Sequence, residues 1–246
     1  MCFQQLSTSP VDTLFPAVCR EEYACDPHRA MERDTELLHE SNRSGYAQFR
    51  VYTWAHPTLS YGRLQKKTDL DISAMDGAGI YCIQRPTGGR ALFHEGDLCF
   101  SFALGRALSR EGRLNRKNVY HMVSHRIVSY LTALGISVQP FLPKTTTHRA
   151  GVSCFLIQNG YEIGSTGKKC VGIALAISAE GILLQGSIPL TPSYEKIVAY
   201  VVGSEKEKQI FLSRLQQKTV CLETLLGRPI SSRSVGAGLC RIFGIG

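Results

Sequence analysis

The chain has 246 residues, 43% of them hydrophobic, and a formal net charge of +8 at pH 7. This length can bury one large core, so two full domains are not required. No stretch of about eighteen apolar residues occurs, and the N-terminus has no basic segment followed by an apolar run, which argues against a membrane span or a secretory signal. We therefore expect a single domain over 1–246, located in the cytoplasm and not bound to a membrane.

The positive charge does not follow the pattern of a nucleic-acid-binding surface. The basic residues are scattered, the cluster at 113–117 is short, and no aromatic residues accompany it. We expect no nucleic-acid partner, because a basic surface serves equally well to attract an acidic protein. The nine cysteines are odd in number and form no Cys-x-x-Cys pair, so we expect reduced thiols and no metal site.

Helix and strand signals alternate in the first part of the chain. Asp26 before Pro27 is typical of the start of a helix, which we expect to end near residue 41. Residues 49–54 alternate in character and predict a strand with two different faces. A short helix is expected over 68–75, where Asp76-Gly77 follows.

The next two predicted strands enclose a loop of unusual composition. Residues 80–84 and 98–104 are rich in aromatic and β-branched residues and predict strands. Between them, residues 85–94 read Arg-Pro-Thr-Gly-Gly-Arg-Ala-Leu-Phe-His. Paired glycines let a backbone lie against a ligand, and the flanking guanidinium groups can donate to an anion or an acyl carbonyl. This loop is predicted to form one wall of a pocket.

The clearest predicted helix begins after Asn115, a potential cap, and ends before Gly135. Its apolar residues recur at intervals of three and four positions: Val119, Met122, Val123, Ile127, Tyr130, Leu131 and Leu134. Strands are expected afterwards at 136–139, 152–157, 161–164, 169–178 and 182–189, with a hairpin turn at 179–181. Residues 193–246 are predicted to form a helical C-terminal segment.

A second functional segment begins with Gly167 and reads Gly-Lys-Lys-Cys-Val-Gly-Ile-Ala. A lysine three residues before a glycine places an ammonium near a point of close backbone approach, where it can neutralise an oxyanion or a phosphate. Strand alternation turns Lys168 and Lys169 to opposite faces, so only one of them can reach a pocket. Lys169 has the right spacing from Gly172, and we expect Lys168 to face solvent.

Together these segments resemble motifs of the biotin/lipoate attachment superfamily, in its lipoate-protein ligase and octanoyltransferase branch. The resemblance extends in order over about residues 28–190 and is closest to the cysteine-dependent octanoyltransferases. It includes Met31 and Asp34, Tyr52-Thr53-Trp54, Tyr61-Gly62-Arg63-Leu64-Gln65, Cys154-Phe155, Tyr161-Glu162 and Leu184-Gln185-Gly186-Ser187-Ile188. It implies a biotin/lipoate ligase-type catalytic domain of the α/β (α+β) class, with a mainly antiparallel mixed sheet flanked by helices.

The resemblance also implies an enzyme of protein lipoylation, which attaches an octanoyl or lipoyl group to a specific lysine. Implied acceptors are the lipoyl domains of 2-oxoacid dehydrogenase complexes or the glycine cleavage H protein, with acyl carrier protein as a candidate donor. Lipoate or octanoate is the implied acyl substrate, with no tightly bound cofactor. The implied catalytic residues are Lys169 and Cys154. The implied substrate-binding residues are Arg85, Thr87, Gly88, Gly89, Arg90, His94, Gly172 and Ala174.

Cys154 separates the possible mechanisms. Between Val152 and Phe155 a cysteine is ordinarily a small buried apolar residue, but Ser153-Cys154-Phe155 resembles the segment that holds the nucleophile in one group of octanoyltransferases. Its thiolate would take the acyl group from a thioester donor, with Lys169 stabilising the oxyanion.

Two alternatives stay open. One is an ATP-dependent lipoate-protein ligase, which uses ATP and Mg²⁺ and makes Cys154 incidental. The other is a non-catalytic acyl-binding homologue, because Ile173 replaces the polar residue that is usual in the family's lysine motif.

Overall fold

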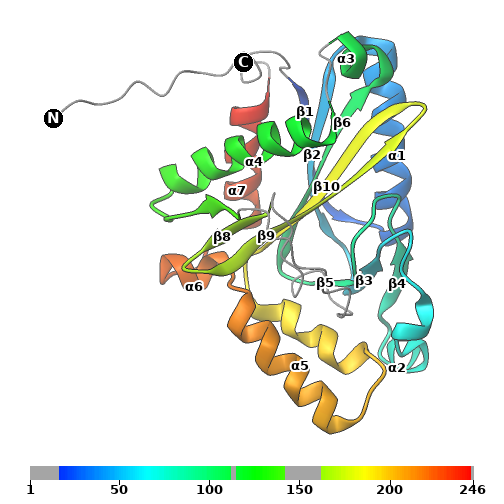
Figure 1. Cartoon of the computed structure of the whole chain (residues 1–246), viewed down its shortest axis with the longest axis vertical. Helices are drawn as coiled ribbons and strands as arrows, with labels where there is room; N and C mark the ends of the chain where they lie inside the picture. Colours follow the sequence, from blue (N-terminus) through cyan, green and yellow to red (C-terminus); the bar gives the residue numbers. More distant parts are fainter. Residues whose placement is uncertain (1–16, 112–114, 142–161, 245–246) are drawn as a thin grey trace, which may run out of the picture.

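The computed structural model describes residues 17–111, 115–141 and 162–244, and a seven-stranded sheet is its main feature (Figure 1). Its strands are β1 (Ala17–Cys25), β2 (Ala47–Trp54), β6 (Asp97–Gly105), β7 (Gln139–Pro140), β8 (Ile163–Ser165), β9 (Lys168–Ser178) and β10 (Gly181–Pro189). They lie in the order β1-β2-β6-β10-β9-β8-β7. β1 is parallel to β2, and the other neighbouring pairs are antiparallel. The expected mainly antiparallel mixed sheet is therefore confirmed.

A second sheet of three strands carries the arginine-glycine loop. It contains β3 (Thr58–Tyr61), β4 (Tyr81–Gln84) and β5 (Leu92–His94), with β3 in the centre, parallel to β4 and antiparallel to β5. The loop leaves β4 and enters β5, as expected for a loop between strands. The sequence did not predict β3 or β5, because each is too short to show an alternating pattern.

Helices cover both faces of the large sheet (Figure 1). Leu37 and Leu38 of α1 (Pro27–Ser44) pack with Ala103 and Leu183 on one face. The other face packs against α4 (Arg116–Ala133) and α7 (Ser232–Phe243), and it holds the larger core cluster. β2 forms the predicted strand with two different faces, and both faces are buried for most of its length.

The helix boundaries agree with the capping signals in the sequence. The Asp26 carboxylate accepts hydrogen bonds from the amides of His28 and Arg29, and Gly45 ends α1 with φ +70°. The Asn115 side chain caps α4 through the amide of Asn118. The remaining helical elements are η1 (Lys67–Asp69), α2 (Ile72–Gly77), α3 (Arg106–Glu111), η3 (Pro192–Tyr200), α5 (Glu205–Lys218) and α6 (Leu222–Leu226).

Two glycines let α7 pack closely against its neighbours. A Cβ at Gly236 would meet the Tyr23 hydroxyl, and a Cβ at Gly238 would meet the ring of Tyr130 on α4. Glycine is a poor helix former, but at these positions it lets α7 approach β1 and α4 closely. Tertiary packing thus outweighs the local propensity.

No helix in the described part of the chain is long and apolar enough to cross a membrane. The strand predicted over 152–157 lies outside the described residues, and so does Cys154.

Candidate functional site

The Arg85 side chain holds the arginine-glycine loop in shape. Its Nη2 donates to the carbonyl oxygens of Gly88 (3.2 Å) and Arg90 (2.8 Å). Its Nη1 donates to Ser60 Oγ on β3 at 2.7 Å. Gly89 adopts φ +92°, a conformation that favours glycine. The guanidinium therefore orders the loop backbone by direct contact.

Two further contacts fix the loop against the rest of the molecule. A Cβ at Gly62 would collide with the backbone of Gly88 and Gly89, so this glycine permits a close approach of the two segments. On the other side, Thr87 is fully buried and its Oγ1 donates to Gln185 Oε1 on β10 at 2.6 Å. Thr87 thus links the small sheet to the large one.

The loop and the lysine-motif strand meet at one narrow cavity. Of the predicted site residues, Arg85, His94, Gly172 and Ala174 line it. The other lining residues are Tyr52, Trp54, Leu92, Cys99, Ile173, Gln185, Gly186 and Ser187. The cavity volume of about 20 Å³ has room for about one water molecule, so an acyl chain can enter only if lining side chains move.

Lys169 lies on β9, three residues before Gly172, and is fully buried. Its Nζ donates to Glu162 Oε1 at 2.5 Å, and the Glu162 side chain is only 2% exposed. Lys168 points the other way, and its Nζ donates to the Gln216 carbonyl on α5 at 2.9 Å. Strand alternation therefore correctly separated the two lysines, but the buried partner of Lys169 was not identified from the sequence.

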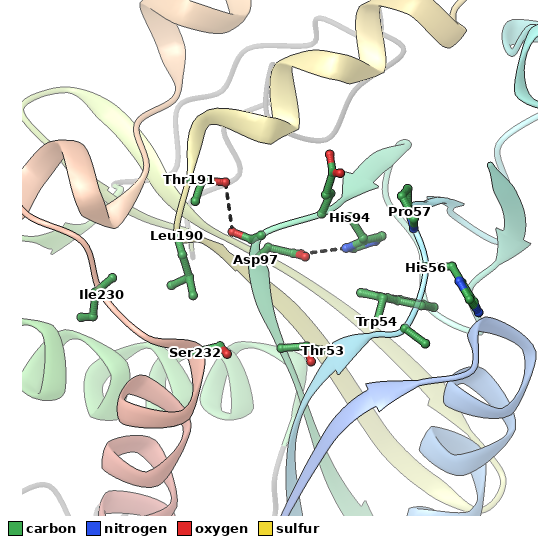
Figure 2. Close-up of a pocket in the computed structure, with 13 residues that line it drawn as sticks. Thr53, Trp54, His56, Pro57, His94, Asp97, Leu190, Thr191, Ile230 and Ser232 are labelled. Carbon is green, nitrogen blue, oxygen red and sulfur yellow. Dashed lines mark hydrogen bonds and ion pairs between the residues drawn. The ribbon is translucent and has the colours of Figure 1, made fainter. Parts of the chain in front are cut away.

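His94 is at the centre of a buried hydrogen-bond network. Its Nε2 lies 2.5 Å from Ser60 Oγ, and its Nδ1 lies 2.8 Å from Asp97 Oδ2 (Figure 2). The Ser187 hydroxyl donates to the same Asp97 oxygen at 2.7 Å. Burial by itself would raise the pKa of Asp97, but the charge of His94 and the hydrogen bonds from His94, Ser187 and Cys99 hold that pKa below its usual value. Burial and the Asp97 charge raise the pKa of the Cys99 thiol well above its usual value.

Figure 2 shows a larger, open groove of about 490 Å³, which shares Trp54 and His94 with the narrow cavity. Trp54 and His94 contribute to the lining of both, so their side chains separate the two spaces. The remaining lining residues of the groove are Thr53, Ala55, His56, Pro57, Glu95, Gly96, Asp97, Leu190, Thr191, Ile230 and Ser232.

The other predicted site residues are less informative. Arg90 is 30% exposed and lies 3.6 Å from the Asp69 carboxylate. A Cβ at Gly88 would meet no atom of the described residues within 4 Å, so steric contact with them does not require a glycine there. Ser60, Asp97 and Cys99 were missed. The i, i+2 spacing of Asp97 and Cys99 at the start of β6 was the available signal, because such residues share one strand face.

Sequence comparison identifies relatives along most of the chain. The profile of the lipoyl protein ligase A/B catalytic domain matches residues 26–244. The octanoyltransferase LipM of an Exiguobacterium species is 31% identical over 195 residues, which cover 76% of this chain and 70% of that protein. The octanoyltransferase LipM of Lysinibacillus sphaericus is 29% identical over 217 residues, covering 84% and 78% of the two chains.

Solved structures share the fold at lower sequence identity. A bipartite lipoate protein ligase of Thermoplasma acidophilum, described together with its E2 lipoyl domain, superposes with a TM-score of 0.73 at 17% identity. That match covers 94% of this chain and 82% of the ligase. Lipoate-protein ligase A bound with ATP gives a TM-score of 0.71 at 17% identity, covering 93% and 83% of the two chains. The expected ligase-type catalytic fold is thereby confirmed.

Proposed function

The chain belongs to the lipoyl protein ligase A/B catalytic domain family, and on this premise we propose that it transfers an octanoyl or lipoyl group to a specific lysine of a lipoyl-carrying protein. The observation that carries this proposal is the meeting of two motifs at one cavity. The loop with Arg85 and His94 faces the strand with Gly172 and Ala174. The buried Lys169 is on the same strand, three residues before Gly172.

The cavity is suited to an acyl chain by its apolar lining. Leu92, Trp54 and Ile173 provide apolar walls, and Ile173 is only 5% exposed. Ile173 also belongs to the main core cluster, so an apolar residue at this position of the lysine motif is accommodated by packing. This lining, with Arg85 and Lys169 both present, favours an active acyl-binding enzyme over a non-catalytic homologue.

Lys169 is the proposed electrostatic catalyst. A cation in a buried site stabilises developing negative charge more strongly than it does in water, because water does not screen it. The 2.5 Å contact with Glu162 fixes the position of the ammonium. In this role Lys169 stabilises the oxyanion that forms when the acyl carbonyl is attacked.

Cys154 is the proposed nucleophile, on the basis of the residues around it. Its thiolate attacks the carbonyl of a thioester donor and expels the donor thiol, which leaves an acyl-cysteine. The neutral amine of the acceptor lysine then attacks this thioester, loses its proton and expels the Cys154 thiolate. The relatives named octanoyltransferase favour this route over one that uses ATP. A lipoyl domain of a 2-oxoacid dehydrogenase complex or the glycine cleavage H protein is the proposed acceptor.

One experiment distinguishes these routes. The protein is incubated with an apo lipoyl domain and either octanoyl-acyl carrier protein or lipoate plus ATP and Mg²⁺, and the domain is weighed by mass spectrometry. We expect an octanoyl mass gain with the carrier protein, loss of transfer in Cys154→Ser, and normal transfer in Cys82→Ser, a half-buried cysteine on β4. A lipoyl mass gain that needs ATP and persists in Cys154→Ala would instead identify a ligase. No mass gain with either donor would contradict the proposed function.

A further inference from the structure

Three potential metal ligands cluster where β5 turns into β6. Within the described ranges, His94, Asp97 and Cys99 form a group whose ligand atoms all lie within 4.8 Å of one another, and all three side chains are buried. His94 Nδ1 is 2.8 Å from Asp97 Oδ2, and Cys99 Sγ is 3.5 Å from the first atom and 3.4 Å from the second. From these contacts we propose that His94, Asp97 and Cys99 bind a zinc ion.

The spacing of the three atoms is close to that of a tetrahedral zinc site. With ordinary zinc bond lengths, a ligand nitrogen and oxygen are about 3.4 Å apart, and either is about 3.6 Å from a ligand sulfur. The two observed distances to Cys99 Sγ, 3.5 and 3.4 Å, nearly match this triangle. The distance between His94 Nδ1 and Asp97 Oδ2 is 2.8 Å, so these two atoms would have to move apart by about 0.6 Å to reach the spacing of two zinc ligands.

Each ligand also has a supporting hydrogen bond from a different strand. Ser60 Oγ of β3 lies 2.5 Å from His94 Nε2, the ring nitrogen away from the cluster. Ser187 of β10 donates to the Asp97 carboxylate at 2.7 Å, and the Trp54 indole of β2 donates to Cys99 Sγ at 3.2 Å. Metal-bound histidines and carboxylates typically carry such second contacts, which orient them.

The chemistry of the ligands selects the ion. Thiolate and imidazole together favour zinc over magnesium or calcium, which prefer oxygen ligands. Binding expels the Cys99 thiol proton to solvent, and the His94 ring proton resides on Nε2, where it is donated to Ser60. With one thiolate and one carboxylate, the two ligand charges balance the charge of Zn²⁺.

The position of the site suggests what the ion does. His94 and Asp97 also line the open groove, so a water molecule can supply the fourth ligand from that side (Figure 2). His94 and Cys99 line the narrow cavity. Zinc would therefore clamp the turn that divides groove from cavity and hold His94 in one orientation.

The test uses the full-length protein, prepared free of affinity tag and metal, without any acyl substrate. Competition with a chromophoric chelator measures Zn²⁺ affinity, and Co²⁺ substitution reports a thiolate ligand through a charge-transfer band in the near ultraviolet. We expect one ion per chain, the thiolate band, and at least tenfold weaker binding in Cys99→Ser and Asp97→Asn. Cys82→Ser, which alters a half-buried cysteine outside the cluster, should bind as the wild type does.

Several results would overturn the zinc site. They are a wild-type protein that binds no ion stoichiometrically, a cobalt complex without the thiolate band, or a Cys99→Ser variant with unchanged affinity. Asp97→Asn keeps the side-chain volume and provides the comparison if Cys99→Ser does not fold. Because no acyl transfer is measured, these outcomes are independent of the proposed enzymatic function.

Discussion

Removal of the Lys169 ammonium should reduce both stability and catalysis, by separable amounts. Lys169 is fully buried, and its removal leaves the Glu162 carboxylate, itself 2% exposed, without its ammonium partner. Breaking a buried ion pair from one side typically destabilises a protein by about 3–5 kcal/mol. Loss of a preorganised charge at the oxyanion adds about 3 kcal/mol to the activation barrier, or roughly a hundredfold in rate.

The two effects can be measured separately with a matched set of variants. Lys169→Met, which keeps most of the side-chain volume, should lose stability in urea unfolding and lose acyl transfer. Adding Glu162→Gln should restore much of the stability, because it removes the buried negative charge that the Lys169 ammonium balanced, but should not restore transfer. Lys168→Ala, which removes the 2.9 Å contact with the Gln216 carbonyl, should remain active.

The pattern of results can refute the proposed role. Near-normal transfer in the double variant at Lys169 and Glu162 would show that the ammonium has no catalytic function. An inactive but stable Lys168→Ala would show that the other lysine serves the active site. A Lys169→Met protein as stable as the wild type would contradict the energetic argument for the buried pair.

Three further predictions concern individual residues. The lowered pKa of Asp97 means that its carboxylate stabilises the fold above the unfolded-state pKa of about 4, and that this stabilisation is lost as the pH falls further. In urea unfolding with EDTA present, the Asp97→Asn variant should therefore have a lower free energy of unfolding than the wild type at pH 7. The difference should become small below about pH 4. Gly238→Ala should destabilise by about 1–3 kcal/mol, because the new methyl group meets the Tyr130 ring, whereas Gly77→Ala has open space and should be neutral or slightly stabilising in thermal unfolding. Burial raises the pKa of Cys170 to about 12, so mass spectrometry should find this thiol unalkylated by iodoacetamide at pH 8 in native protein and modified after unfolding.

The loop and the lysine strand could be predicted because their signals are local. A double glycine between two arginines and the alternation of Lys168 and Lys169 depend only on neighbouring residues. The partners of these groups could not be predicted, because they lie on or next to other strands and come together only when the strands pair and pack. Ser60, for example, is 34 positions from His94 and still touches its ring. Such a contact depends on the pairing of β3 with β5 in the small sheet.

The edge of the large sheet was also missed, for a related reason. β1 contains Arg20, Glu21 and Glu22 in succession, a polar run that hides a strand. Glu22 pairs with the buried Arg50 of β2 at 2.9 Å, so the charge is satisfied by a partner that the local sequence does not reveal. Residues 192–243 contain the helical elements η3, α5, α6 and α7, and the close packing of α7 against the sheet was not predicted.

The contact between α7 and the sheet also constrains how the chain folds during synthesis. The Phe243 ring stacks on Phe49 with centroids 4.0 Å apart, and Gly244 forms a bridge with Ala17. β1 and β2 are synthesised early because they lie near the N-terminus. The face of these strands that packs against α7 stays exposed to solvent until α7 has left the ribosome. An apolar surface exposed for that interval is a binding site for chaperones. Ribosome-bound chains stalled before residue 232 should be protease-sensitive over β1 and β2, and the released full-length chain should be protected there.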